Sequence, residues 1–113
     1  MKYIGGIILF CISACCGADS IGFGKVVAVK QYDFNATKVI KIYLSSDSTN
    51  VVESCEENGK VRGTITLAQH DEAAVNRMVS LATAAYMAGK KIRLHSESNS
   101  CEVDFVALQE AVF

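Results

Sequence analysis

The stretch VRGTITLAQHDEAAVNRMVSLATAAYMAGKKIRLH, residues 61–95, decides the fold of this chain. The spacing of its apolar residues changes twice. Residues 61–67 alternate between apolar and polar, residues 71–88 repeat apolar side chains every three or four positions, and residues 91–95 alternate again. Alternation predicts a strand with one buried face, and the longer period predicts an amphipathic helix. The stretch therefore predicts a strand, a helix and a second strand.

The ends of the predicted helix carry matching signals. Asp71 and Glu72 place negative charge at its start, where the helix dipole is positive. Gly89, followed by Lys90 and Lys91, suits its end. We expect the apolar stripe to face the core; it consists of Ala74, Val75, Met78, Leu81, Ala82, Ala85 and Tyr86.

Three further strands complete the order. They are residues 23–32 (FGKVVAVKQY), residues 38–44 and residues 103–108, with a short extended piece at 51–52. The strand residues expected to face inward are Ile40, Ile42, Leu44, Val61, Gly63, Ile65, Leu67, Ile92 and Leu94. A mainly β chain of order β-β-β-α-β-β is typical of a small OB-like barrel. An open sheet fits less well, because its edge strands would stay unprotected.

The N-terminus predicts export. Lys2 is followed by an apolar run, residues 3–12, which is shorter than the about 20 residues of a membrane-spanning helix. This pattern indicates a signal peptide of residues 1–18, cut after Ala18, and a single OB-like domain of residues 19–113. Residues 12–15 (ISAC) also fit a bacterial lipoprotein signal, in which Cys15 would be lipidated and would anchor the chain in the envelope.

The chain has five cysteines, and three of them precede the predicted cut. Cys55 and Cys101 then remain alone in an exported chain, where disulfides form and persist. On the chain-entropy model, a bond between them would add about 4 kcal/mol of stability. A zinc site would need at least two more ligands, and a disulfide explains the pair more simply.

Charge excludes some classes of partner. The chain has 11 basic and 12 acidic side chains and no run of basic residues. This balance argues against nucleic acid or an anionic membrane surface as a partner. No pattern of residues indicates a cofactor or a metal ion, and we expect none.

Residues 82–94 (ATAAYMAGKKIRL), followed by Cys101, resemble the helix-to-strand segment of subtilase-cytotoxin-type B subunits and of small secreted bacterial proteins with that fold. The resemblance is sharp over residues 78–101 and extends in layout over 21–113. It implies an OB fold with one disulfide, a ring pentamer, binding of sialylated glycans and delivery of a separate enzymatic subunit. It carries over no binding residue, since no tyrosine aligns with a glycan contact and the chain has no tryptophan.

Tyr32 and Tyr43 are the candidate ligand-binding residues. Sugar sites combine an apolar floor, often aromatic, with a few polar groups. Alternation places Tyr43 opposite Ile42, on the outer face of the barrel, where an exposed aromatic would contact a ligand or a neighbouring subunit. The plainer alternative is that tyrosine simply favours strands.

No catalytic constellation is evident. His70 and His95 are the only histidines, and we expect both to be surface residues. The serines of residues 45–48 and 96–100 lie in polar loops, and Glu56-Glu57 before Asn-Gly predicts a solvated turn. We therefore expect a secreted or periplasmic, non-enzymatic binding module, with a ring-forming glycan-binding toxin subunit as its specific form. The alternative is a stand-alone envelope lipoprotein of structural or inhibitory role.

Overall fold

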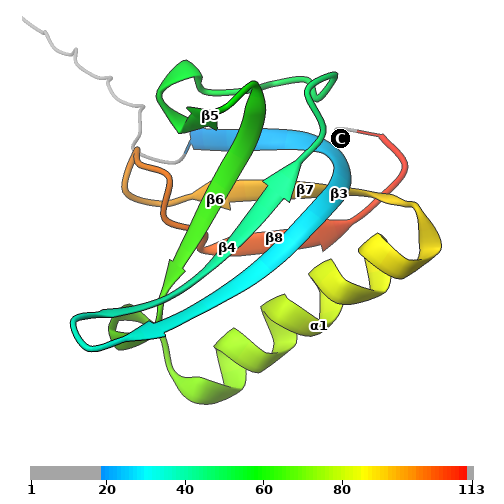
Figure 1. The fold of residues 1–113 in the computed structure, drawn as a ribbon. Coiled ribbons are helices and arrows are strands. Elements are labelled where there is room, and N and C mark those ends of the chain that lie inside the picture. The colour runs from blue at the N-terminus through cyan, green and yellow to red at the C-terminus, as the bar shows by residue number, and fades with distance from the viewer. Residues whose placement is uncertain (1–18, 112–113) are drawn as a thin grey trace, which may run out of the picture.

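The computed structural model describes residues 19–111, a mainly antiparallel sheet with one α-helix (Figure 1). The predicted signal peptide, Cys15 and the last two residues lie outside this range. The elements are β3 (Asp19–Phe34), β4 (Thr37–Leu44), η3 (Glu53–Cys55), β5 (Glu56–Glu57), β6 (Lys60–Thr66), η4 (Leu67–Gln69), α1 (Glu72–Ala88), β7 (Lys91–Ser96) and β8 (Phe105–Leu108). No helix among these residues is long and apolar enough to cross a membrane.

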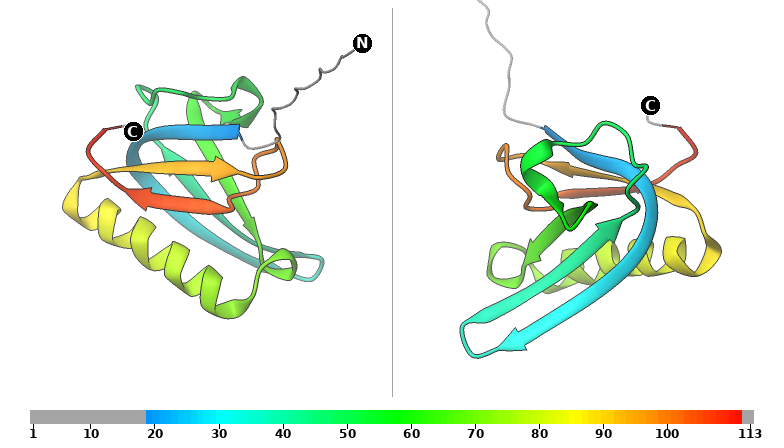
Figure 2. Two further views of the ribbon diagram at one scale, coloured as in Figure 1. Left: turned by 180° about the vertical axis from the view of Figure 1, so that it is seen from behind. Right: turned by 45° about the horizontal axis from the view of Figure 1, so that its top comes forward.

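The sheet curls into a small barrel. Its strand order is β5-β6-β4-β3-β7-β8, and the segment before β8 runs back alongside β6 in parallel. There, the backbone N–H of Thr64 donates to the carbonyl of Cys101, and that of Val103 donates to the carbonyl of Thr64, both at 2.8 Å. The expected fold class, β-β-β-α-β-β with an OB-like barrel, is therefore confirmed. The helix lies beneath the strands (Figures 1 and 2).

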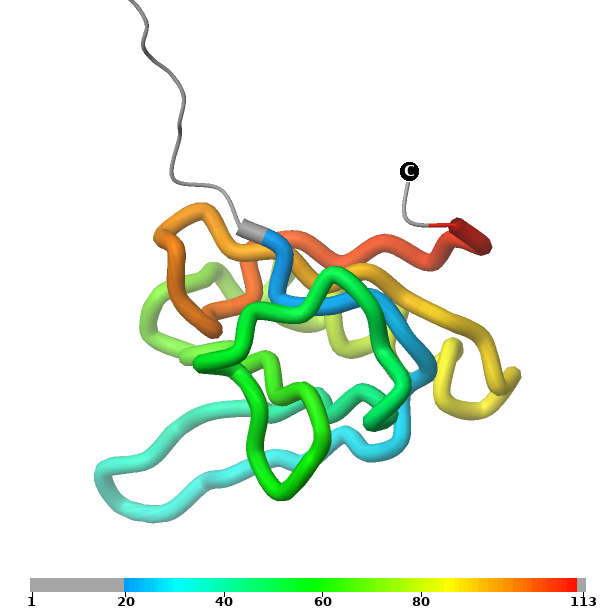
Figure 3. The backbone as a smooth tube through the Cα atoms, turned by 90° about the horizontal axis from the view of Figure 1, so that it is seen from above, coloured from blue at the N-terminus to red at the C-terminus, as the bar shows by residue number. Residues whose placement is uncertain are grey.

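β3 is longer than expected because it pairs with two different strands along its length. Its first part pairs with β7 and its second part with β4, and the register shifts between Val26 and Ala28. Gly24 permits a close contact in the first part: a Cβ there would lie 2.0 Å from the Ser48 hydroxyl oxygen. Residues 45–52 can thus lie along β3, with Phe23 and Thr49 exchanging two 2.9 Å backbone hydrogen bonds (Figure 3).

The core confirms most of the predicted inward positions. The strands contribute Ile21, Ile40, Ile42, Leu44, Val61, Ile65, Ile92 and Leu94, the segment before β8 contributes Val103, and the helix contributes Val75, Met78, Ala82 and Ala85. Gly63 also points inward, and a Cβ there would lie 2.6 Å from Val103. Leu67 is a correction: it begins η4 and is only partly buried against the core.

The helix begins and ends where the sequence predicts. The Asp71 side chain caps it by accepting a 2.7 Å hydrogen bond from the backbone of Ala74, and Gly89 ends it with a φ of 67°. Tyr86 was expected in the core, but it is 54% exposed. It directly follows the buried Ala85, and successive helical residues point about 100° apart, so it lies beyond the edge of the stripe.

Two short segments also differ from expectation. Residues 51–52 form no strand, although both valines pack against the core. Glu56-Glu57 is not a solvated turn but the strand β5, which pairs with the start of β6. Asn58 and Gly59 make the connection with φ values of 55° and 78°, which suits a two-residue hairpin turn.

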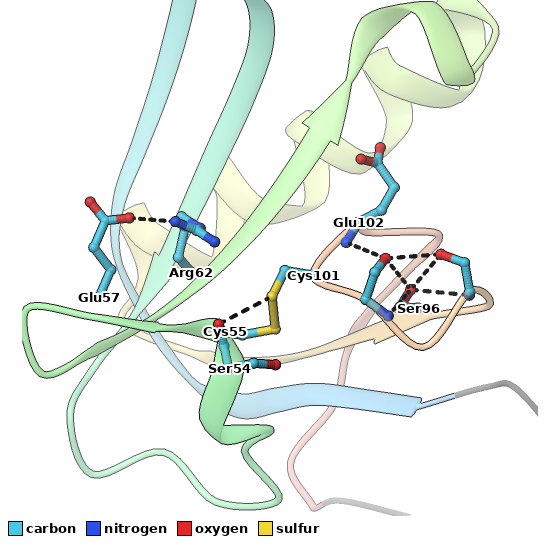
Figure 4. The surroundings of a disulfide bond; sticks show 9 residues. Ser54, Cys55, Glu57, Arg62, Ser96, Cys101 and Glu102 are labelled. Atoms are coloured by element: carbon cyan, nitrogen blue, oxygen red, sulfur yellow. Dashed lines mark hydrogen bonds and ion pairs between the residues drawn. A yellow bond between two sulfur atoms is a disulfide. The ribbon is translucent and has the colours of Figure 1, made fainter.

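Cys55 and Cys101 form the predicted disulfide, across a sequence separation of 46 residues (Figure 4). Cys55 is completely buried at the end of η3, and Cys101 lies in the segment that closes the barrel against β6. The bond therefore ties the polar loop ahead of β6 to the barrel seam.

Beyond the barrel, β3 and β4 continue as a two-stranded ribbon, residues 31–39, which extends past the end of β6 (Figure 2). None of its residues is buried, and Phe34 at its tip is 68% exposed. The last rung that the ribbon shares with β6 joins Val39 to Thr66.

Candidate functional site

The two candidate tyrosines lie on one outer face of the sheet, together with two lysines. We call Lys30, Tyr32, Lys41 and Tyr43 the tyrosine–lysine face. β3–β4 pairing puts Lys30 directly opposite Lys41, and the neighbouring rungs place Tyr32 and Tyr43 on the same side. Because side chains alternate along a strand, this face points away from the core side of β4.

Each lysine of this face lies over an aromatic ring. Like charges placed directly opposite one another in a sheet lower its stability. Here the Lys30 ammonium lies 4.9 Å from the centre of the Tyr43 ring, and the Lys41 ammonium lies 4.8 Å from that of Tyr32. Such cation–π contacts offset the repulsion. Tyr32 also meets Phe34 edge-on, with ring centres 6.1 Å apart.

Tyr43 is on the expected face, but it is not exposed as expected. Only 6% of its surface is accessible. Its hydroxyl donates to a Glu57 carboxylate oxygen at 3.4 Å, and Arg62 donates to the other oxygen of Glu57 at 2.8 Å (Figure 4). Lys30 from β3 and Glu57 from β5 therefore cover the Tyr43 ring, which the alternation of β4 alone predicts to be exposed.

The pKa values of Tyr43 and Glu57 are shifted in opposite directions, and the shifts determine which of the two is charged. Burial raises the pKa of Tyr43 above its ordinary value of 10.0, and the Glu57 carboxylate raises it further. The hydrogen bond from Arg62 holds the pKa of Glu57 below its ordinary 4.5. At neutral pH, Tyr43 is thus a neutral hydrogen-bond donor and Glu57 a charged acceptor.

A small pocket opens beside Tyr43. Its volume is about 190 Å³, and its polar lining comes from Lys30, Tyr43, Glu57, Asn58 and Lys60. Sites for drug-sized ligands usually measure about 300–1,000 Å³. This pocket can therefore hold one charged or polar group of a larger ligand, and two of its side chains are cations.

A larger groove lies between the ribbon and the first half of α1. It measures about 660 Å³, and its lining includes Gln31, Ile40, His70, Val75 and Asn76. The lining contains no tyrosine, phenylalanine, lysine or arginine. Its only aromatic ring is the His70 imidazole, which lies against Glu102.

His70 corrects the expectation of a plain surface residue, since only 12% of its side chain is exposed. Its Nε2 lies 2.8 Å from a Glu102 carboxylate oxygen and 3.7 Å from one of Asp104. Thr66 donates to Glu102 through its backbone N–H and its hydroxyl, both at 2.7 Å. We call Thr66, His70 and Glu102 the polar clamp. It joins the end of β6 to the start of α1 and to the barrel seam.

The polar clamp has no evident route to covalent chemistry. Within residues 19–111, no serine or cysteine is hydrogen-bonded to His70, and the Thr66 hydroxyl donates to Glu102 instead. Nucleophilic catalysis needs a hydroxyl or thiol in contact with the base. Among the same residues, no group of three His, Cys, Asp or Glu side chains could hold a metal ion.

The remaining candidates occupy ordinary positions. His95 faces outward from β7 as expected, but its ring packs edge-on against Phe105 with centres 6.0 Å apart. The hydroxyls of Ser96, Ser98 and Ser100 lie 2.9–3.3 Å from one another and brace the loop before Cys101 (Figure 4). This loop was expected from its composition, but its hydroxyl cluster was not.

No protein-family model, curated protein or solved structure matches this chain. The resemblance to subtilase-cytotoxin-type B subunits therefore stays a prediction. The OB-like assignment rests on the strand order and on the contact that closes the barrel.

Proposed function

We propose that this chain is a non-enzymatic, exported module that binds a negatively charged glycan through the tyrosine–lysine face. The observation that carries the proposal is the pairing of two tyrosines with a cation-lined pocket on one outer face of β3, β4 and β6. OB folds bind oligosaccharides on the face of their second and third strands, which are β4 and β6 here.

The charges around the pocket favour an anionic sugar. Lys30, Lys41, Lys60 and Arg62 contribute four cations, and Glu57, the acidic residue that lines the pocket, is already bound by Arg62. A sugar carboxylate would meet the ammonium groups of Lys30 and Lys60, which line the pocket. A ring placed on Tyr32 would displace Lys41, whose long side chain can move at little cost. The resemblance to the B subunits favours a sialylated glycan.

Saturation-transfer NMR with sialyllactose and lactose tests the ligand class. We expect the natural sequence to bind the sialylated sugar more tightly, and the double variant Lys30→Ala, Lys60→Ala to lose that preference. Lys38→Ala is the matched control, because its ion pair with Asp33 lies on the exposed ribbon away from the pocket. Equal binding of both sugars, or binding untouched by the double variant, would remove the anionic-glycan assignment.

Ring assembly and a separate enzymatic subunit belong to the same proposal and rest on the resemblance. Sedimentation analysis of the mature protein at micromolar concentration tests the ring. A strict monomer would end the ring proposal, while leaving glycan binding by single domains to be measured directly. Mass spectrometry of the mature N-terminus separates a soluble chain cut after Ala18 from one acylated at Cys15.

A further inference from the structure

Exposed apolar side chains gather at the end of the molecule where α1 stops. Met87 is 80% exposed, Tyr86 54% and Leu108 47%. Val27, which is 37% exposed, lines a hollow of about 430 Å³ together with Tyr86. Residues 78–89 contain no charged side chain at all. Exposed apolar side chains that gather in one place are typical of a contact surface.

Three lysines border the same end. Lys25, Lys90 and Lys91 line a hollow of about 440 Å³ that also includes Leu108, and Glu110 is the acidic residue in its lining. β3–β7 pairing places Lys25 directly opposite Lys91. Two like charges in directly opposite positions are unfavourable by themselves. The Lys91 ammonium lies 5.6 Å from the centre of the Phe23 ring, and this cation–π contact offsets part of the repulsion. A partner with negative charge would offset more of it.

The two hollows adjoin. Val27 follows Lys25 by two residues on β3, and Gly89, in the lysine hollow, donates its backbone N–H to the carbonyl of Tyr86 at 3.4 Å. The apolar side chains and the lysines thus form one surface. We call it the apolar–lysine end, made up of Lys25, Val27, Tyr86, Lys90, Lys91 and Leu108.

A structural role explains only part of this surface. Lysines after the last turn of a helix stabilise its negative end, which accounts for Lys90 and Lys91. Asp47, whose pKa is lowered first by a hydrogen bond from Ser45 and further by Lys91 and Lys25, offsets part of the charge. Neither contact accounts for the exposure of Leu108 beside these cations.

We infer that the apolar–lysine end binds the surface of a bilayer that contains anionic phospholipid. Peripheral membrane contacts combine apolar side chains that enter the interface with basic side chains that reach lipid phosphates. Leu108 and Val27 supply the first kind, the three lysines supply the second, and Tyr86 suits the headgroup level. The net charge of −1 and the lack of a basic run in the sequence argue against an anionic membrane surface as a partner. The inference departs from that expectation because strand pairing brings Lys25 and Lys91 together in a local basic cluster.

Flotation with lipid vesicles tests the inference on the full mature protein. We expect it to float with vesicles of phosphatidylglycerol and phosphatidylcholine in equal parts, not with pure phosphatidylcholine, and to be released by salt. Lys90→Gln with Lys91→Gln should weaken binding by about fivefold for each lysine removed. Leu108→Gln should weaken it as well, because it removes the exposed apolar side chain that lines the lysine hollow.

The matched control is Lys38→Gln with Arg77→Gln, which changes the net charge equally and lies outside both the lysine hollow and the pocket beside Tyr43. It should leave flotation unchanged, and circular dichroism should show that every variant is folded. Equal flotation with neutral vesicles, equal loss in the control, or no flotation at all would overturn the inference. So would saturable binding of dispersed short-chain phosphatidylglycerol that abolishes flotation, because it would show a pocket for single lipids. Glycan binding is measured without vesicles, so either proposal can fail alone.

Discussion

The two ends of β3 have the same extended backbone but very different surroundings. At the start, β7 lies on one side and residues 49–52 on the other, so Ile21 is fully buried and Phe23 is 5% exposed. At the far end, only β4 is paired, and Phe34 is 68% exposed. The comparison shows that neighbours, rather than strand propensity, decide where stability lies.

The barrel part of β3 and the ribbon also differ in what they contribute to stability and to binding. The barrel part of β3 needs glycine at position 24 to admit Ser48, and it contributes buried side chains. The ribbon contributes little to the core, so packing does not restrict which side chains its outer face can present to a ligand. Changes in the barrel part should therefore alter the free energy of unfolding, whereas changes in the ribbon should not.

Loss of the disulfide should have the largest effect on stability. Cys55→Ala with Cys101→Ala removes a link across 46 residues, which on the chain-entropy model lowers the free energy of unfolding by about 4 kcal/mol. Urea denaturation followed by circular dichroism measures it, with the reduced natural protein for comparison. A loss below about 1 kcal/mol would mean that the barrel seam is held by its other contacts.

Gly24→Ala should come next. The added Cβ would lie 2.0 Å from the Ser48 hydroxyl oxygen and 3.1 Å from the Ser48 Cα, so the loop must shift. Overpacking of this kind lowers the free energy of unfolding by about 1–3 kcal/mol. Ser48→Gly in the same chain should recover much of the loss, which a double-mutant cycle would measure. Additive effects would show that some other contact is disturbed.

The polar clamp sits where the barrel ends and the ribbon begins. Thr66→Val keeps the side-chain shape but removes the hydroxyl that donates to Glu102, so the free energy of unfolding should fall by about 1 kcal/mol. Thr37→Val, at the exposed start of β4, is the control and should change little. Equal effects at the two positions would show that the hydrogen bond from the Thr66 hydroxyl to Glu102 adds nothing to the free energy of unfolding.

Local patterns predicted the parts of this structure that depend on one segment. The alternation of Ile40, Ile42 and Leu44 and the caps of α1 lie within single elements, so the sequence was sufficient. A one-residue slip would turn every side chain of a strand to the other face, and therefore buried alternation also fixes register. The disulfide followed from the cysteine count and the predicted export.

Contacts between distant segments could not be predicted in this way. The polar clamp joins His70 to Glu102 across 32 residues, and Tyr43 is covered from β3 and β5. Lys25 and Lys91 form no basic run in the sequence, yet strand pairing sets them face to face. Each of these depends on which strands become neighbours, and a single segment does not carry that information.

Arg62→Gln should have a smaller effect, visible at acidic pH. Arg62 is the main cause of the lowered pKa of Glu57, so the variant should raise that pKa towards 4.5. A lowered pKa in the folded state adds stability above the unfolded value, and this stability is lost as the pH falls through the folded value. The variant should therefore lose less stability below pH 4.5 than the natural protein does. NMR titration of the Glu57 carboxyl measures the shift, with Arg77→Gln as control; an unchanged pKa would point to Lys41 or Tyr43 as its cause.

Phe34→Ser should have the smallest effect on stability and gives the sharpest test of the two-part picture. The side chain is 68% exposed and its ring meets that of Tyr32 edge-on, so the free energy of unfolding should change by no more than about 0.5 kcal/mol. Loss of that edge contact frees the Tyr32 ring, so glycan binding, measured by NMR, should change more than stability does. Phe23→Ser on the same strand is the counterpart, and it should strongly destabilise the protein because Phe23 is 5% exposed. Similar losses of stability at the two positions would mean that the ribbon is part of the cooperative fold.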